Sequence, residues 1–252
     1  MSLAEFNEKK SALRQSEGAL LRSDLGALKR SLGLFVRNCD ELLDFLRATD
    51  GRDPEATIKL WALQNREGFD RFLDEADRLL HNVVAAAVSL REHSYRVRDK
   101  WLPPAAGDDL RAQHDDRVAE VFARSRTAQL IEGIRNIVQH RKLPRLRGSL
   151  SYSSAAEVFE SNLHLDRDDL LEWDGWSAEL RSYLQGEEEV DLGEIVAAYR
   201  DTVVGFHEWF RIAVEQRNAP ALERFEQERQ EVSDYGSRLF GPPLNDPGAA
   251  AQ

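Results

Sequence analysis

The chain has 252 residues, a formal net charge of -11 and a single cysteine, Cys39. This length can bury a substantial core without cross-links, and one cysteine excludes both an internal disulfide and a thiolate metal cluster. The composition, 42% hydrophobic and 31% charged with many Leu, Ala, Glu and Arg residues, is typical of a soluble, mainly helical globular protein.

The N-terminal half is expected to form long amphipathic helices. Residues 2–18 predict a loose helix, and apolar residues at steps of four and three predict a long helix over about 21–46. That apolar seam consists of Leu21, Leu25, Leu28, Leu32, Phe35, Cys39, Leu42 and Leu46. Asp53 and Pro54 are a good cap and first-turn pair for a short helix, and a second long helix should end before Pro103.

The middle of the chain predicts further helix and then a change of pattern. Asp108 or Asp109 can cap the next helical region, within which Thr127 is a candidate start for a fresh helix. Pro144 disfavours helix from the residue before it. Over 145–166, apolar and polar residues alternate in two short runs, which predicts a small β-hairpin or extended arm.

Helix is expected again over most of the remaining chain. Leu170, Trp173 or Trp176, Leu180 and Leu184 would face a core. A further stripe consists of Leu192, Ile195, Tyr199, Val203, Phe206, Phe210 and Ala213, and a last helix follows Pro220. The sequence therefore predicts an all-α fold, an antiparallel bundle of long helices forming one domain over 1–240, with a disordered tail at 241–252.

The stretch "IRNIVQHRKLP" contains the candidate catalytic residues Arg135, Asn136 and His140. On a helix, Asn136 and His140 share a face because they are four residues apart, and Arg135 lies at the edge of that face. Metal-independent RNA cleavage needs a group that moves protons near neutral pH and a cation that stabilises the phosphate charge, which are the roles of histidine and arginine. Equally, both residue types interact well with a helix C-terminus without any catalytic role.

A basic run follows this motif in an otherwise acidic protein. Arg141, Lys142, Arg145 and Arg147 lie in a segment without any acidic residue. The run is either a solvated, charged turn or a patch that holds the phosphates of an RNA substrate. Since the net charge is strongly negative, any contact with nucleic acid should be local rather than a general coating.

Other site classes lack a signal in the sequence. The six histidines form no pair at helical spacing and no close cluster, and neither a glycine-rich phosphate loop nor a nucleophile elbow is present. We therefore expect no metal and no cofactor. A second arginine and histidine pair, Arg200 and His207, is expected on the solvent flank of its helix, and core packing explains the five tryptophans better than base stacking.

The run "RNIVQH", together with the earlier "HNVVAAAVSLREHSYR", resembles the HEPN superfamily (higher eukaryote and prokaryote nucleotide-binding domain). The resemblance implies a metal-independent endoribonuclease, active as a toxin or in phage defence, in which His140 is the acid or base and Arg135 the phosphate ligand. It further implies a homodimer and an antitoxin partner, with His93 and Arg96 either supporting the site or forming a satisfied polar pair. Because many HEPN-like domains are inactive, the alternative is a non-catalytic module that binds a nucleotide or a protein.

The expected location is the cytoplasm. No apolar run approaches the ~20 residues that span a bilayer. The first residues also lack the basic-then-apolar order of a signal peptide. These features predict a protein without a membrane anchor.

Overall fold

The computed structural model describes residues 2–48, 53–62, 64–103, 110–141, 143–153, 158–187 and 189–241. Its helices are α1 (Leu3–Gln15), α2 (Glu17–Arg47), α3 (Pro54–Trp61), α4 (Arg66–Trp101), α5 (Leu110–Val118), the π-helical segment η1 (Ala119–Ala123), α6 (Arg126–His140), α7 (Arg167–Leu171), α8 (Ala178–Gly186), α9 (Leu192–Arg217) and α10 (Ala219–Phe240). Its strands are β1 (Leu146–Ser153), β2 (Val158–Leu165) and β3 (Val190–Asp191). The all-α class with a small β insertion is confirmed.

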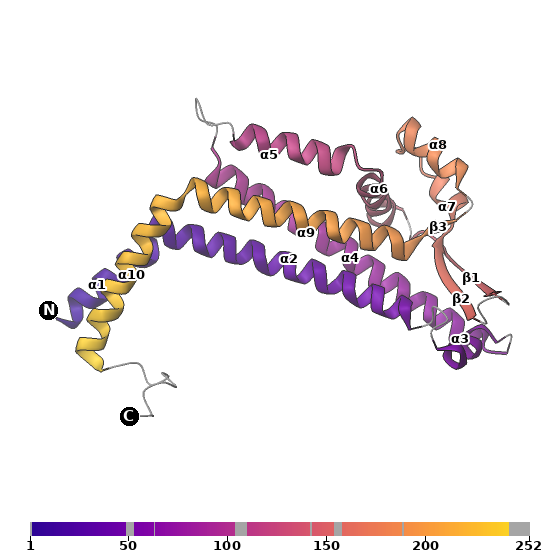
Figure 1. Cartoon of the computed structure of the whole chain (residues 1–252), viewed down its shortest axis with the longest axis horizontal. Coiled ribbons are helices and arrows are strands. Elements are labelled where there is room, and N and C mark those ends of the chain that lie inside the picture. Colours follow the sequence, from indigo (N-terminus) through magenta and orange to yellow (C-terminus); the bar gives the residue numbers. More distant parts are fainter. Residues whose placement is uncertain are drawn as a thin grey trace.

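The centre of the fold is the long pair α2 and α4, which lie side by side with α9 packed against α2 (Figure 1). The predicted seam of α2 forms the contact, since Leu21, Phe35, Cys39 and Leu42 are fully buried. α6 packs against both α4 and α9, so the later helices cover the apolar faces that the first two would expose alone. None of the described helices has the length and hydropathy needed to cross a bilayer.

The helix boundaries follow local capping. Ser16 ends α1 and caps α2 by accepting a hydrogen bond from the Ala19 amide, so the separate N-terminal helix expected over 2–18 ends at Gln15. Ser125, rather than Thr127, caps α6. The predicted cap at Asp108 or Asp109 and the predicted tail from 242 onward lie outside the described residues.

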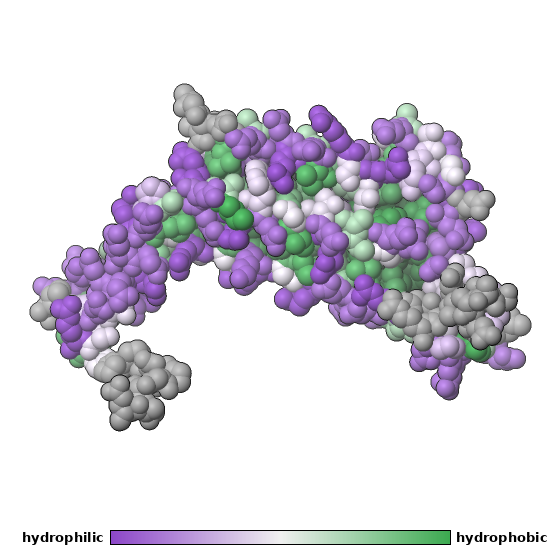
Figure 2. Space-filling view, viewed as in Figure 1, coloured by the Kyte–Doolittle hydropathy of each residue, from purple (hydrophilic) through white to green (hydrophobic). Residues whose placement is uncertain are grey.

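α1 and α10 together form an arm that extends from the body, at the end opposite the β-sheet (Figure 1). Phe6 stacks on Tyr235, with 5.7 Å between the ring centroids, and the Tyr235 hydroxyl donates to the Ser2 carbonyl. On the face seen in Figure 2, most of the arm is hydrophilic, and apolar surface gathers over the body. The arm meets the central core near the start of α10, where Leu222 packs against it.

The predicted β-insertion is an antiparallel hairpin in which Leu146 pairs with Leu165 and Ser153 with Val158. The two residues of β3 add a short third strand through His164 and Leu165. Leu163 and Leu165 are buried as the alternation predicts, but His164 on the other face is buried as well. His164 Nε2 lies 2.8 Å from Ser149 Oγ and 2.9 Å from Glu189 Oε2, whereas the buried Nδ1 has no hydrogen-bond partner among the described residues.

Candidate ligand pocket

A pocket of about 470 Å³, here called the central pocket, lies between α4, η1, α6, α9 and the segment that joins α7 to α8. Its aromatic lining residues are Tyr95, Phe122, Trp173, Trp176, Tyr199 and Phe206. Its polar lining residues are Arg91, Ser94, His114, Gln129, Glu132, Asn136, Ser177 and His207. Small-molecule sites have this volume and this combination of apolar walls with a few polar groups.

Two local features of the chain give the central pocket its shape. η1 is a π-helical turn that places Phe122 in the wall, and such turns occur often at functional sites. Opposite, the indole of Trp176 lies directly against the backbone of α6 at Gly133, and its Nε1 donates to the Leu170 carbonyl over 2.6 Å. Gly133 permits this close approach because it has no side chain.

Substituting Gly133 should therefore test whether Trp176 holds the pocket wall in place. A Cβ atom at Gly133 would lie 1.9 Å from the indole Cζ3, so Gly133→Ala must displace the ring. We expect a loss of about 1–3 kcal/mol of unfolding free energy, the usual cost of overpacking. The matched control is Gly205→Ala in α9, where the added Cβ meets no described atom within 4 Å. The control should gain about 0.5–1 kcal/mol from helix propensity, and equal melting temperatures would contradict the close contact.

His207 and Ser94 form a buried hydrogen-bonded pair in the central pocket. Ser94 Oγ lies 3.2 Å from His207 Nε2, and His207 Nδ1 lies 2.8 Å from the Val203 carbonyl oxygen. Burial lowers the pKa of His207 to about 4, although the hydrogen bond to Val203 opposes the shift. His207 is thus neutral near pH 7, and the prediction that it lies on the solvent flank of α9 is wrong.

The pKa values of His114 and Tyr199 are also shifted by their surroundings. Burial lowers the pKa of His114, against the effect of a hydrogen bond to Asp115 over 3.0 Å. Burial, together with the negative charge of Glu132, raises the pKa of Tyr199 to about 12. Several titratable groups with shifted pKa values around one cavity are a common mark of a functional site.

The predicted catalytic residues are only partly brought together. Asn136 lines the central pocket, and Arg135 lies on its flank, where its guanidinium pairs with Glu132 on the same helix. Glu132 also accepts from Arg91 of α4 over 3.1 Å, so it lies between two arginines. His140 is exposed at the C-terminal end of α6 and is not among the lining residues. The structure thus places Asn136, but not His140, at the cavity.

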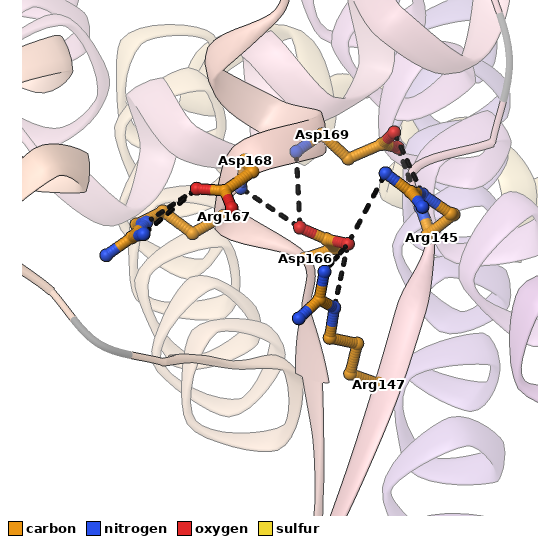
Figure 3. Close-up of polar contacts among 6 residues, drawn as sticks. All are labelled: Arg145, Arg147, Asp166, Arg167, Asp168 and Asp169. Atoms are coloured by element: carbon orange, nitrogen blue, oxygen red, sulfur yellow. Dashed lines mark hydrogen bonds and ion pairs between the residues drawn. The ribbon is translucent and has the colours of Figure 1, made fainter.

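The basic run contacts acidic residues that lie elsewhere in the sequence. Arg147 Nε lies 2.8 Å from Asp166 Oδ2, and Arg145 Nε lies 3.2 Å from Asp169 Oδ1 (Figure 3). Arg141 donates to the Glu172 carbonyl over 2.9 Å. Arg145 and Arg147 therefore pair with acidic residues from outside the basic run, because the hairpin returns the chain to the two aspartates. Lys142 lies outside the described residues.

Burial and the neighbouring positive charges shift the pKa of Asp166 in opposite directions. Its side chain is almost completely buried, which alone would raise its pKa, but the Asp169 amide, Arg147 and Arg145 stabilise the ionised carboxylate and lower the pKa. The same side chain caps α7 by accepting from the amides of Asp168 and Asp169. Asp166 with Arg145, Arg147 and Asp169, here called the Asp166 cluster, therefore joins β1 to the start of α7.

The remaining two predicted residues lie on α4, away from the cavity lining. His93 bonds through Nδ1 to Ser31 Oγ of α2, and Arg96 is exposed. The His93 contact joins the two helices of the core pair, so the partner of His93 is Ser31 and not Arg96. In the part of the chain that the structure describes, no three His, Cys, Asp or Glu side chains are placed to share a metal ion.

Comparison with known proteins assigns no relative, because no family model, curated protein or solved structure matches the chain.

Proposed function

We propose that the protein is a helical binding module that takes a nucleotide, with the base held in the central pocket. The observation that carries this proposal is the aromatic lining of a cavity of about 470 Å³ that also contains amide side chains. Trp173 and Trp176 meet edge to face, with ring centroids 4.7 Å apart, and offer apolar ring surface to a planar ligand. Stacking of a base on an aromatic side chain contributes about 1–3 kcal/mol.

Polar groups at the central pocket suit the edge of a base and the phosphate group of a nucleotide. Asn136 can both donate and accept at the edge of a base, as asparagine does with adenine. Arg91 lines the pocket, and both Arg91 and Arg135 form ion pairs with Glu132. The three side chains are between about one-fifth and one-half exposed. Such exposed pairs are weak, so a phosphate group can compete with Glu132 for the two guanidinium groups.

The test is titration with AMP, GMP, CMP and UMP, followed by tryptophan fluorescence and calorimetry. At least one nucleotide should bind and quench the fluorescence, and Trp173→Ala should weaken binding by about 5- to 150-fold, the equivalent of one stacking contact. Trp209→Ala is the matched control, because Trp209 is also partly buried but lies outside the pocket lining. Absence of binding by all four nucleotides would refute the proposal.

The ribonuclease suggested by the HEPN resemblance is a second proposal, favoured by one observation. His140 and Arg141 are adjacent and exposed at the end of α6, where they are accessible to a large RNA substrate. Arg135 would have to leave Glu132 to bind the scissile phosphate. A cytoplasmic homodimer, acting as a toxin or defence protein with an antitoxin partner, belongs to this proposal.

Incubation with total RNA in EDTA tests the ribonuclease proposal. If His140 moves the proton, the wild-type protein should cut RNA without added metal, and His140→Ala should be slower by about 100-fold or more. Arg135→Ala should also be impaired, whereas His81→Ala, an exposed histidine on α4, should cut normally. RNA left equally intact by all four proteins would contradict this activity, and light scattering would report the oligomeric state.

A further inference from the structure

The hydrogen-bonding roles of Ser94 and His207 are fixed by the Val203 carbonyl. A carbonyl oxygen only accepts, so His207 Nδ1, 2.8 Å away, must carry the proton. In the neutral ring, Nε2 is then an acceptor, and the Ser94 hydroxyl at 3.2 Å must be the donor. The Ser94 oxygen therefore retains its lone pairs but has no proton left to donate to a ligand.

Two other lining residues are acceptors for the same reason. His114 Nδ1 donates to the Asp115 carboxylate over 3.0 Å, so Nε2 of the neutral ring is an acceptor. The Gln129 amide uses one N–H of Nε2 to donate to the Ala123 carbonyl over 2.5 Å; its carbonyl oxygen is an acceptor, and its second N–H is still a donor. All three acceptors belong to side chains that line the central pocket.

We propose that the central pocket selects its ligand through N–H groups, so that it prefers an amino-substituted heterocycle over the same ring without an amino group. This inference rests on the proposed nucleotide binding and specifies the base. An amino group supplies two N–H donors, which can pair with two of the three acceptors of Ser94, His114 and Gln129. A ring without it would leave buried acceptors dehydrated and unpaired, which is the main source of discrimination in polar pockets.

Three nucleosides of similar size test the preference: adenosine, purine riboside and N6,N6-dimethyladenosine. Purine riboside lacks the amino group and adds no bulk, whereas the dimethyl compound keeps the nitrogen and removes both protons. We expect adenosine to bind at least tenfold more tightly than either analogue, by calorimetry on the full-length protein. Equal binding of adenosine and purine riboside would overturn the preference while leaving nucleotide binding in place. Failure of adenosine and all four nucleotides would instead overturn both proposals.

A variant of His114 adds a site-specific readout. His114→Phe removes the acceptor and keeps a ring among Phe206 and Phe210, whose centroids lie 5.6 and 5.0 Å from the imidazole. The preference for adenosine over purine riboside should fall at least threefold in this variant. His81→Phe, the same substitution at an exposed position of α4, should leave the ratio unchanged. An unchanged ratio in a folded His114→Phe protein would remove His114 from the recognition site.

Discussion

Lowering the pH from 6.5 to 4 is expected to cost the folded protein about 3 kcal/mol through His207 alone. The pKa of His207 is about 4 in the folded state, against about 6.5 for an exposed histidine. The unfolded chain therefore binds the proton first as the pH falls. The contribution to stability is fully present above pH 6.5 and is lost as the pH approaches 4. His114, whose pKa burial also lowers, acts in the same direction.

Urea unfolding at several pH values between 7 and 4.5 measures this effect. His207→Gln retains a donor and an acceptor for Val203 and Ser94 but does not titrate, so its stability should fall less steeply with pH than that of the wild type. His140→Gln changes an exposed histidine and should keep the wild-type slope. The same slope in all three proteins would show that His207 is not the titrating group.

Asp166→Ala is expected to lower the unfolding free energy by about 2–4 kcal/mol. The substitution removes the cap of α7, worth about 0.5–2 kcal/mol, and the buried acceptor of Arg147, whose Nη2 lies 2.7 Å away. The side chains of Arg145 and Arg147 are both 63% exposed, so water can solvate the arginines that lose Asp166. The full cost of breaking a buried ion pair therefore does not apply.

Asp168→Ala is the matched control for Asp166→Ala. Asp168 lies two residues further along the chain and forms an exposed pair with Arg167 at 2.9 Å (Figure 3). Such pairs contribute about 0–1 kcal/mol, so the control should unfold close to the wild type. Chemical denaturation measures both, and similar losses for the two variants would mean that the buried cluster does not stabilise the join between β1 and α7.

The Asp166 cluster also bears on RNA binding by the basic run. A phosphate that approaches Arg145 or Arg147 must compete with buried carboxylates that are already hydrogen bonded to them. This competition weakens the support for a phosphate patch at these two residues. It leaves Arg141 as the exposed arginine beside His140 for the ribonuclease proposal.

Local patterns predicted most of the fold. The seam of α2 recurs at steps of three and four residues, and a stripe of that kind must be buried in any compact fold. The hairpin could also be predicted, because alternation with period two is specific to strands. The boundary between the first two helices was expected at Gly18 rather than Ser16, since a single capping serine inside a helical pattern competes weakly with propensity on both sides.

The candidate site was predicted less well, although the spacing of His207 along α9 does indicate that this histidine is buried. His207 lies four residues after Val203 and three before Phe210, which places it on the buried stripe of α9 rather than on the solvent flank. That spacing could have identified a buried histidine. Its partner Ser94 is 113 residues away and has no comparable signal, because a serine inside a helix is common on any face.

By itself, the sequence determined the helices, the hairpin and the position of Asn136 on α6, because these depend on interactions between near neighbours in the chain. Only the tertiary structure decided which charges meet and where a cavity remains. Arg147 and Asp166 pair because β2 runs antiparallel to β1, and Ser94 meets His207 because α4 and α9 pack into one core. Hydrogen bonds and ion pairs act over a few ångströms in space, and separation along the chain does not set that distance.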